Sequence, residues 1–133
     1  MTHPIVRTLT VITKMPISEV SECRQREGSV FLDAAFSSHE QATCLKRRRP
    51  DHGLAARYAA REGLRRACEE LGLRPPSSPA EAEVIHDAFG APRFRLSGDF
   101  CHELRHHELN LSLAHDGNLA CAILVVQSAL NGD

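Results

Sequence analysis

The order of apolar and polar positions in the first third of the chain predicts a strand followed by two short helices. Residues 8–14 (Thr-Leu-Thr-Val-Ile-Thr-Lys) are rich in β-branched side chains, which favour a strand. Residues 17–26 follow Pro16 and precede Gly28, so they predict a helix with a start and a stop signal. The sequence Ser-Ser-His-Glu at residues 37–40 fits a capping box and predicts that another helix begins there.

A long helix is expected in the middle of the chain. The run Lys46-Arg47-Arg48-Arg49-Pro50 should end the helix before it, because proline disfavours helical conformation in the preceding residue. Asp51 is the expected N-cap of the long helix, and Gly72 is its expected end. Residues 75–79 (Pro-Pro-Ser-Ser-Pro) predict a stiff loop within the domain, since too little chain follows them for a second core.

The second half of the chain changes to short strands joined by turns. The expected strands cover residues 82–86, 93–97, 109–114 and 119–127. Turns are expected at residues 87–90 and 115–118, the second with an Asp-Gly hairpin signal, and a helix over residues 98–107 separates the middle two strands. This order predicts an α+β domain in which helices pack on a small antiparallel sheet.

The composition is typical of one compact domain, which we expect to span residues 1–133. The chain is 42% apolar, which is enough to build a core. A net charge of −1 gives no overall field that favours nucleic acid or a membrane surface, and no apolar run reaches the ~20 residues of a membrane span. Five cysteines without C-x-x-C spacing fit reduced thiols, and no export leader is evident, so we expect a cytoplasmic protein.

Glu62 is the most informative residue of the long helix. It lies three residues after Ala59 and four after Tyr58, so it shares a helical stripe with apolar neighbours. A carboxylate on a packing face is costly unless it is paired or bound to a cation. Two interpretations stay open at this point: an i,i+4 ion pair with Arg66, or a functional cation site.

The pentapeptide His102-Glu103-Leu104-Arg105-His106 matches H-E-x-x-H, the motif that places two zinc-binding histidines on one helical face. The expected helix is short, the chain is small for a protease and no third ligand is evident. A solvated His-rich helix face is the favoured interpretation, and a zinc hydrolase is the alternative.

Several motifs occur together in a known order. The helix segment 57–67 resembles R-F-A-A-K-E-A-x-x-K-A, with arginine in place of both lysines. Gly90-Ala91-Pro92 is similar to a Gly-x-Pro turn, residues 111–116 to a hairpin h-S-h-[ST]-H-[DT], and residues 36–40 to F-[ST]-x-x-E. These are motifs of the holo-acyl-carrier-protein synthases, the small 4′-phosphopantetheinyl transferases. The chain is similar to this family over residues 36–126, with compatible spacing throughout.

The resemblance implies a phosphopantetheinyl transferase-like fold and a homotrimer whose active sites are shared between subunits. It implies transfer of 4′-phosphopantetheine from coenzyme A to a serine of an apo acyl carrier protein, an acidic partner, with release of 3′,5′-ADP. It also implies Mg²⁺ bound through Glu62, and catalytic roles for Glu62 and Arg66. The residues it places against coenzyme A are Arg57, Arg61, Gly90, Pro92, Ser112 and His115.

Three of these elements also have plain interpretations. Ser112 fits a strand residue better than a nucleophile, since no base is arranged beside it, and a lone loop histidine such as His115 is most often a surface residue. The basic run at residues 46–49 is either a solvated run or a landing site for the acidic carrier, with Arg24 and Arg26 on the same side.

The first strand departs from the family pattern G-[IL]-G-x-D-[IL], whose aspartate is the first metal ligand. Residues 7–15 contain no acid, and Thr10 and Thr13 are the candidate positions for the missing one. A single carboxylate holds Mg²⁺ more weakly than two. The alternative hypothesis is therefore a homologue that binds coenzyme A or the carrier protein without transferring phosphopantetheine.

Overall fold

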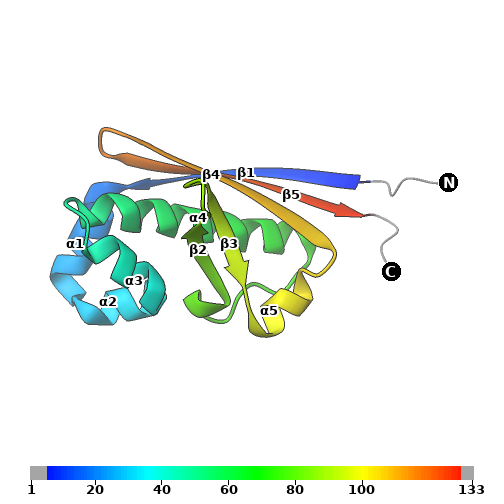
Figure 1. Cartoon of the computed structure of the whole chain (residues 1–133), viewed down its shortest axis with the longest axis horizontal. Helices are drawn as coiled ribbons and strands as arrows, with labels where there is room; N and C mark the ends of the chain where they lie inside the picture. The colour runs from blue at the N-terminus through cyan, green and yellow to red at the C-terminus, as the bar shows by residue number, and fades with distance from the viewer. Residues whose placement is uncertain (1–5, 130–133) are drawn as a thin grey trace.

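A three-stranded antiparallel sheet and one long helix packed against it form the centre of the fold (Figure 1). The computed structural model describes residues 6–129. The strands β1 (Val6–Pro16), β5 (Leu119–Ala129) and β4 (His107–Asp116) lie in the order β1-β5-β4. β5 is therefore the central strand, and it pairs with β1 along the whole length of both strands.

The long helix α4 (Pro50–Leu71) lies against one face of this sheet. Its sheet-facing side carries small residues, which allow the helix and the strands to approach closely. Gly63 lies so near Thr13 that a Cβ atom at position 63 would be 2.8 Å from Thr13 Oγ1. The buried residues that join helix and sheet include Ala59, Ala60, Leu64, Ala122, Leu124 and Val126.

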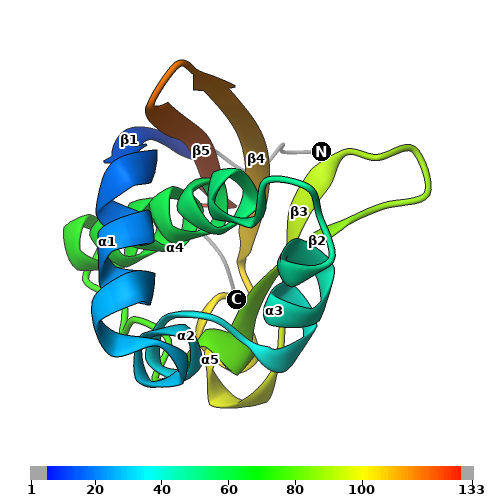
Figure 2. The same ribbon diagram turned by 90° about the vertical axis from the view of Figure 1, so that its left-hand side faces the viewer.

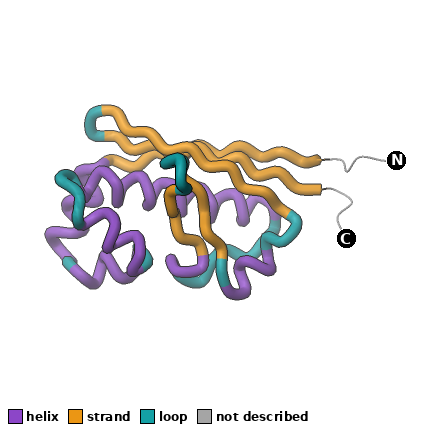
Figure 3. Tube along the Cα trace, in the orientation of Figure 1, coloured by secondary structure: helices purple, strands orange, loops and turns teal. Residues whose placement is uncertain are grey.

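The other face of the three-stranded sheet is not covered by any described helix (Figure 3). Side chains alternate along each strand, so the residues between the buried ones point outward. Ile12 and Ile123 lie opposite each other on this outer face and are 56% and 39% exposed. An apolar pair therefore lies on an open sheet surface.

Three short helices pack at one end of α4. They are α1 (Ile17–Glu27), α2 (Ser29–Ala35) and α3 (Ser38–Leu45). A second group of buried residues joins them to α4, including Val20, Phe36, Cys44 and Leu54. The sequence did not predict α2, which has only seven residues and follows α1 after the single residue Gly28.

A separate two-stranded sheet is formed by β2 (Ala82–His86) and β3 (Pro92–Leu96). It follows the short 3₁₀ helix η1 (Pro79–Glu81), and α5 (Gly98–Glu103) leads from it to β4. Its turn projects from the body of the molecule (Figure 2), and the Phe89 side chain in this turn is 96% exposed.

The predicted α+β architecture with antiparallel pairing is confirmed, although the strands form two sheets and not one. The predicted strands and the capping box are also confirmed: Ser37 Oγ accepts from Glu40 N, and Glu40 Oε1 accepts from Ser37 N. The prediction for Asp51 is wrong, because α4 begins at Pro50. Asp51 instead accepts hydrogen bonds from Ser21 Oγ (2.6 Å) and Arg24 Nε (2.8 Å).

The predicted helix over residues 98–107 is shorter than expected and ends at Glu103. His106 therefore lies beyond the helix that carries His102, so the H-E-x-x-H spacing does not place both imidazoles on one helical face. Glu103 Oε2 accepts a hydrogen bond from the Arg74 backbone N–H at 2.8 Å. Within residues 6–129 no helix has the length and apolar character needed to cross a membrane.

Candidate functional site

Helix α4 contributes side chains to two separate hollows. The first, which we call the basic pocket, is a cavity of about 550 Å³ between the start of α4, the end of β2 and the end of β4. Its lining contains four arginines, three histidines and no carboxylate; the full lining is Arg47, Arg48, Arg49, His52, Gly53, Ala56, Arg57, His86, Leu113, Ala114 and His115.

Arg57 lies at the bottom of the basic pocket and is only 2% exposed. Its Nη1 donates to the carbonyl of Gly53 at 3.2 Å, and its Nη2 lies 3.4 Å from His86 Nδ1. Its Nε is buried and has no hydrogen-bond partner among the described residues. Burial lowers the pKa of the guanidinium, but arginine stays charged at neutral pH. A fixed positive charge with an unused donor therefore lies in this pocket.

The three histidines of the basic pocket come from three different elements: His52 from α4, His86 from β2 and His115 from β4. Burial, and then the charges of Arg57 and Arg47, lower the pKa of His86, which favours the neutral form of its ring. Its Nδ1 then accepts from Arg57, which places the ring proton on Nε2. The rings of His52 and His115 meet edge to face with 5.1 Å between their centres.

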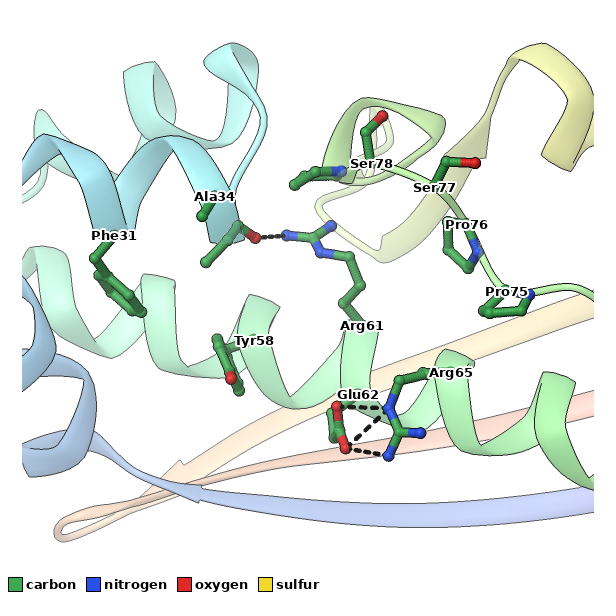
Figure 4. A pocket seen from close by; sticks show the side chains of 12 residues that line it. Phe31, Ala34, Tyr58, Arg61, Glu62, Arg65, Pro75, Pro76, Ser77 and Ser78 are labelled. Atoms are coloured by element: carbon green, nitrogen blue, oxygen red, sulfur yellow. Dashed lines mark hydrogen bonds and ion pairs between the residues drawn. The ribbon is translucent and has the colours of Figure 1, made fainter.

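The second hollow is a groove of about 440 Å³ between α2, α4 and the loop of residues 75–79 (Figure 4). Its walls are mainly apolar and include Phe31, Ala34, Tyr58, Pro75 and Pro76. Arg61, Glu62 and Arg65 from α4 complete the lining. An apolar channel with charged groups along one side suits an extended ligand that has both apolar and polar parts.

Glu62 is tied to the arginine three residues further along α4. Its Oε1 accepts from Arg65 Nη2 at 2.6 Å, and both of its oxygens lie within 3.2 Å of Arg65 Nε. Arg66 Nε, the partner expected from the i,i+4 spacing, lies at 3.9 Å from Oε1. The predicted ion pair thus exists, but Arg65 is the main partner. Hydrogen bonding from Arg65 holds the pKa of Glu62 below its usual range.

Arg61 is occupied by contacts within the fold. Its guanidinium donates to the carbonyls of Ala82 (2.7 Å) and Ala35 (2.9 Å), and it forms an ion pair with Glu40. These bonds join α4 to β2, α2 and α3. The prediction that Arg61 contacts coenzyme A therefore falls on a side chain whose two Nη groups already form hydrogen bonds within the fold.

Comparison with known proteins identifies the family. No protein-family model matches the chain. A holo-[acyl-carrier-protein] synthase of Mycobacterium sp. (strain KMS) is 31% identical over 123 residues, which cover 87% of this chain and 93% of that protein. A holo-[acyl-carrier-protein] synthase of Geobacter sulfurreducens is 34% identical and covers 76% of this chain and 82% of its own length.

Solved structures agree with these relatives. The ACPS–CoA complex of Chronobacterium ammoniagenes superposes with a TM-score of 0.78 at 28% identity, covering 92% of this chain and 98% of that one. The Helicobacter pylori synthase in complex with coenzyme A has the same fold, with a TM-score of 0.75 at 23% identity over 89% of this chain and 99% of that one. The chain belongs to the holo-[acyl-carrier-protein] synthase family.

The structure distributes the site residues implied by membership of the holo-[acyl-carrier-protein] synthase family over several places. Arg57 and His115 share the basic pocket, whereas Glu62 lies in the groove. Gly90 (φ +83°) lies in the projecting turn between β2 and β3, and Pro92 begins β3 directly after this turn. Ser112 is exposed on the outer face of the sheet, opposite Ile123. One chain alone does not bring these residues together.

The basic pocket also contains residues that the sequence did not indicate. His52 and His86 line it because the end of β2 folds next to the start of α4. The run Arg47-Arg48-Arg49, which the sequence suggested as a landing site for the carrier, lines the same cavity. No local signal connects His86 with this run, because His86 lies 37 positions after Arg49 in the sequence.

The described residues do not fit the Mg²⁺ ion that the resemblance to holo-[acyl-carrier-protein] synthases implies. Thr10 points outward from β1, and Thr13, which faces α4, carries only a neutral hydroxyl. Both oxygens of Glu62 are engaged by Arg65. Within residues 6–129 no three His, Cys, Asp or Glu side chains are grouped as metal ligands. No step of the reaction is therefore assigned to a metal ion.

Proposed function

We propose that this chain transfers 4′-phosphopantetheine from coenzyme A to a serine of an apo acyl carrier protein. The basic pocket is the observation that carries the proposal: four arginines and no carboxylate line one cavity. Coenzyme A has a diphosphate and a 3′-phosphate, which together carry about four negative charges, since a phosphate monoester carries −1.5 to −2 at neutral pH. The four arginines of the basic pocket therefore match the phosphate charge of coenzyme A in sign and in number.

The proposed reaction is a phosphoryl transfer. The serine hydroxyl oxygen attacks the phosphorus that carries pantetheine, the bond to 3′,5′-ADP breaks, and the serine proton is released to solvent or base. Such transition states are loose, so the protein contributes mainly positioning and stabilisation of charge. We assign this work to Arg57 in the basic pocket and to Arg66, which keeps the catalytic role that the family resemblance implies.

We assign Glu62 to the positioning of Arg65, because its oxygens accept hydrogen bonds from that guanidinium. Its lowered pKa makes it a poor acceptor for the serine proton. Arg61 serves the fold through its bonds to Glu40, Ala35 and Ala82. The groove beside Glu62 is proposed to hold the pantetheine arm, whose length and mixed polarity suit its apolar walls.

We further propose a homotrimer with sites shared between subunits. The open sheet face with Ile12 and Ile123 supports an interface, because burial of this apolar pair stabilises association. In such an assembly the projecting turn with Gly90, together with Pro92 at the start of β3, would contact the adenine bound to a neighbouring subunit, and Ser112 would lie at the interface. A cytoplasmic location fits five free cysteines.

Incubation with coenzyme A and an apo acyl carrier protein, followed by mass spectrometry of the carrier, tests the proposed transfer. We expect a gain of one phosphopantetheine group, lost when the acceptor serine is replaced by alanine. An acidic carrier is the expected partner, because the arginines of the basic pocket favour negative charge. Binding of coenzyme A without any gain in carrier mass would instead identify a homologue that keeps only the binding surface.

A further inference from the structure

The first strand of this chain has no anionic group to offer a metal ion. The residues of β1 that face α4 are Leu9, Val11, Thr13 and Met15. Thr13 is 2% exposed, and its hydroxyl has no hydrogen-bond partner among the described residues. It faces Gly63, next to Glu62 in the helix, and the missing side chain at position 63 leaves room for its β-branched side chain. A neutral, buried hydroxyl therefore occupies this position.

The nearby carboxylate of α4, that of Glu62, is already paired with arginines of the same helix. Arg65 holds both oxygens of Glu62, and Arg66 lies within ion-pair distance. Arg65 also reaches Glu69, with 3.2 Å between Nη1 and Oε2. A divalent ion at Glu62 would have to displace Arg65, without a second carboxylate from β1 to compensate. The charges around Glu62 are balanced within the helix.

The positive charge needed by a coenzyme A phosphate group lies elsewhere, in the basic pocket. Its four arginines face no carboxylate within the lining. Arg57 is buried and has an unused Nε donor, and attraction to an anion is stronger where water is excluded. Guanidinium groups bind phosphate oxygens in a fixed two-pronged geometry, which a hydrated lysine does not provide.

We infer that coenzyme A binds to this chain without a divalent metal ion, with the arginines of the basic pocket supplying the charge that the metal supplies elsewhere in the family. This inference rests on the proposed function for the identity of the ligand. It goes beyond the proposed function because it states that coenzyme A binding does not require Mg²⁺.

Calorimetric titration of the full chain with coenzyme A, once with EDTA and once with millimolar Mg²⁺, tests the inference. We expect the dissociation constants measured in EDTA and in Mg²⁺ to agree within about twofold. Loss of one strong charged contact would change the dissociation constant about tenfold, which corresponds to about 1.4 kcal/mol. The same two conditions are then applied to the carrier-mass assay.

The outcomes separate the two claims. Equal affinity in EDTA and Mg²⁺ supports the inference, whether or not the carrier gains mass. Binding that tightens by more than about twofold with Mg²⁺ overturns the inference and leaves the proposed function in place, whether or not the transfer step itself needs Mg²⁺. If coenzyme A binds under neither condition, the proposed function fails and the inference fails with it.

Discussion

Glu40 and Arg61 form a two-point ion pair in the interior, with 2.6 Å between Arg61 Nη2 and Glu40 Oε1 and 3.0 Å between Nη1 and Oε2. The Glu40 side chain is fully buried, and that of Arg61 is 14% exposed. Glu40 Oε2 also accepts from the backbone N–H of Val84 at 2.8 Å. The pair therefore joins α3 and α4 to the first strand of the β2–β3 sheet.

Glu40→Gln should lower the free energy of unfolding by about 3–5 kcal/mol, because it leaves the Arg61 charge buried without its partner. Urea unfolding followed by circular dichroism measures this change. Glu69→Gln is the matched control, since Glu69 pairs with Arg65 on the surface of the same helix and is 75% exposed. It should hardly change the unfolding midpoint. Equal effects of the two substitutions would contradict a structural role for the buried pair.

Arg48→Ala and Arg49→Ala should each weaken coenzyme A binding about tenfold and reduce its dependence on salt, because each removes one phosphate contact. Dephospho-coenzyme A, which lacks the 3′-phosphate, should bind more weakly to the wild-type protein and be less affected by these substitutions. Calorimetry at two ionic strengths measures both effects. Substitutions that leave coenzyme A affinity unchanged would remove the basic pocket from the proposed site.

Thr13→Asp should create a metal response that the wild-type chain lacks. The new carboxylate would be buried beside Gly63, so it should lower the thermal midpoint without metal and recover part of the loss when Mn²⁺ binds. Thr10→Asp is the matched control, because Thr10 points outward from the same strand. If Mn²⁺ does not change the thermal midpoint of Thr13→Asp, position 13 of the first strand is too far from Glu62 for the two carboxylates to bind one ion.

Ile123→Lys should convert the proposed trimer to a monomer, because it places a charge at the centre of the open sheet face, opposite Ile12. Light scattering coupled to size-exclusion chromatography measures the mass. Val30→Lys provides the control: Val30 lies on α2, away from the sheet, and is 71% exposed, so the same change in charge should leave the mass unaltered. A wild-type chain that is already monomeric rules out the shared site.

His86 should titrate below the ordinary histidine pKa of about 6.5, because burial and the charge of Arg57 oppose its protonation. A group whose pKa is lower in the folded state takes up its proton more readily in the unfolded chain. Stability should therefore fall as the pH drops from above 6.5 through the lowered pKa of His86. NMR titration of the ring proton reports this pKa directly.

His86→Asn should reduce this loss of stability at acid pH, because asparagine offers Arg57 a hydrogen-bond acceptor but does not become charged. Unfolding midpoints at several pH values compare the variant with the wild type. An NMR pKa above 6.5 for His86 would show that an anion, and not Arg57, dominates its surroundings.

The sequence predicted those parts of the fold that depend on neighbours along the chain. The capping box at Ser37 and Glu40 and the helix end at Gly72 rest on hydrogen bonds that span only a few residues, so local chemistry determines them. The helix α2 was missed because its seven residues carry too little periodic pattern. Asp51 was assigned wrongly because its actual partner, Arg24, comes from another helix.

The candidate site was predictable only where a motif names its residues. The family resemblance points to Arg57, Glu62 and His115. It does not indicate that Arg57 and His115 line one hollow of this chain and Glu62 another. Spacing allowed Glu62 to pair with either Arg65 or Arg66, and only the rotamers of the folded helix decide between them. The contact of Arg57 with His86 bridges 29 residues and could not be inferred from either segment.

The position of β5 between β1 and β4 has a consequence for the synthesis of this protein. Within the described residues β1 pairs only with β5, so the first strand emerges from the ribosome about a hundred residues before its partner. Until then the backbone hydrogen-bonding edge of β1 has no partner strand, and the side of α4 that packs on β5 is uncovered. Chaperones should therefore be able to bind the nascent chain until β5 has been synthesised.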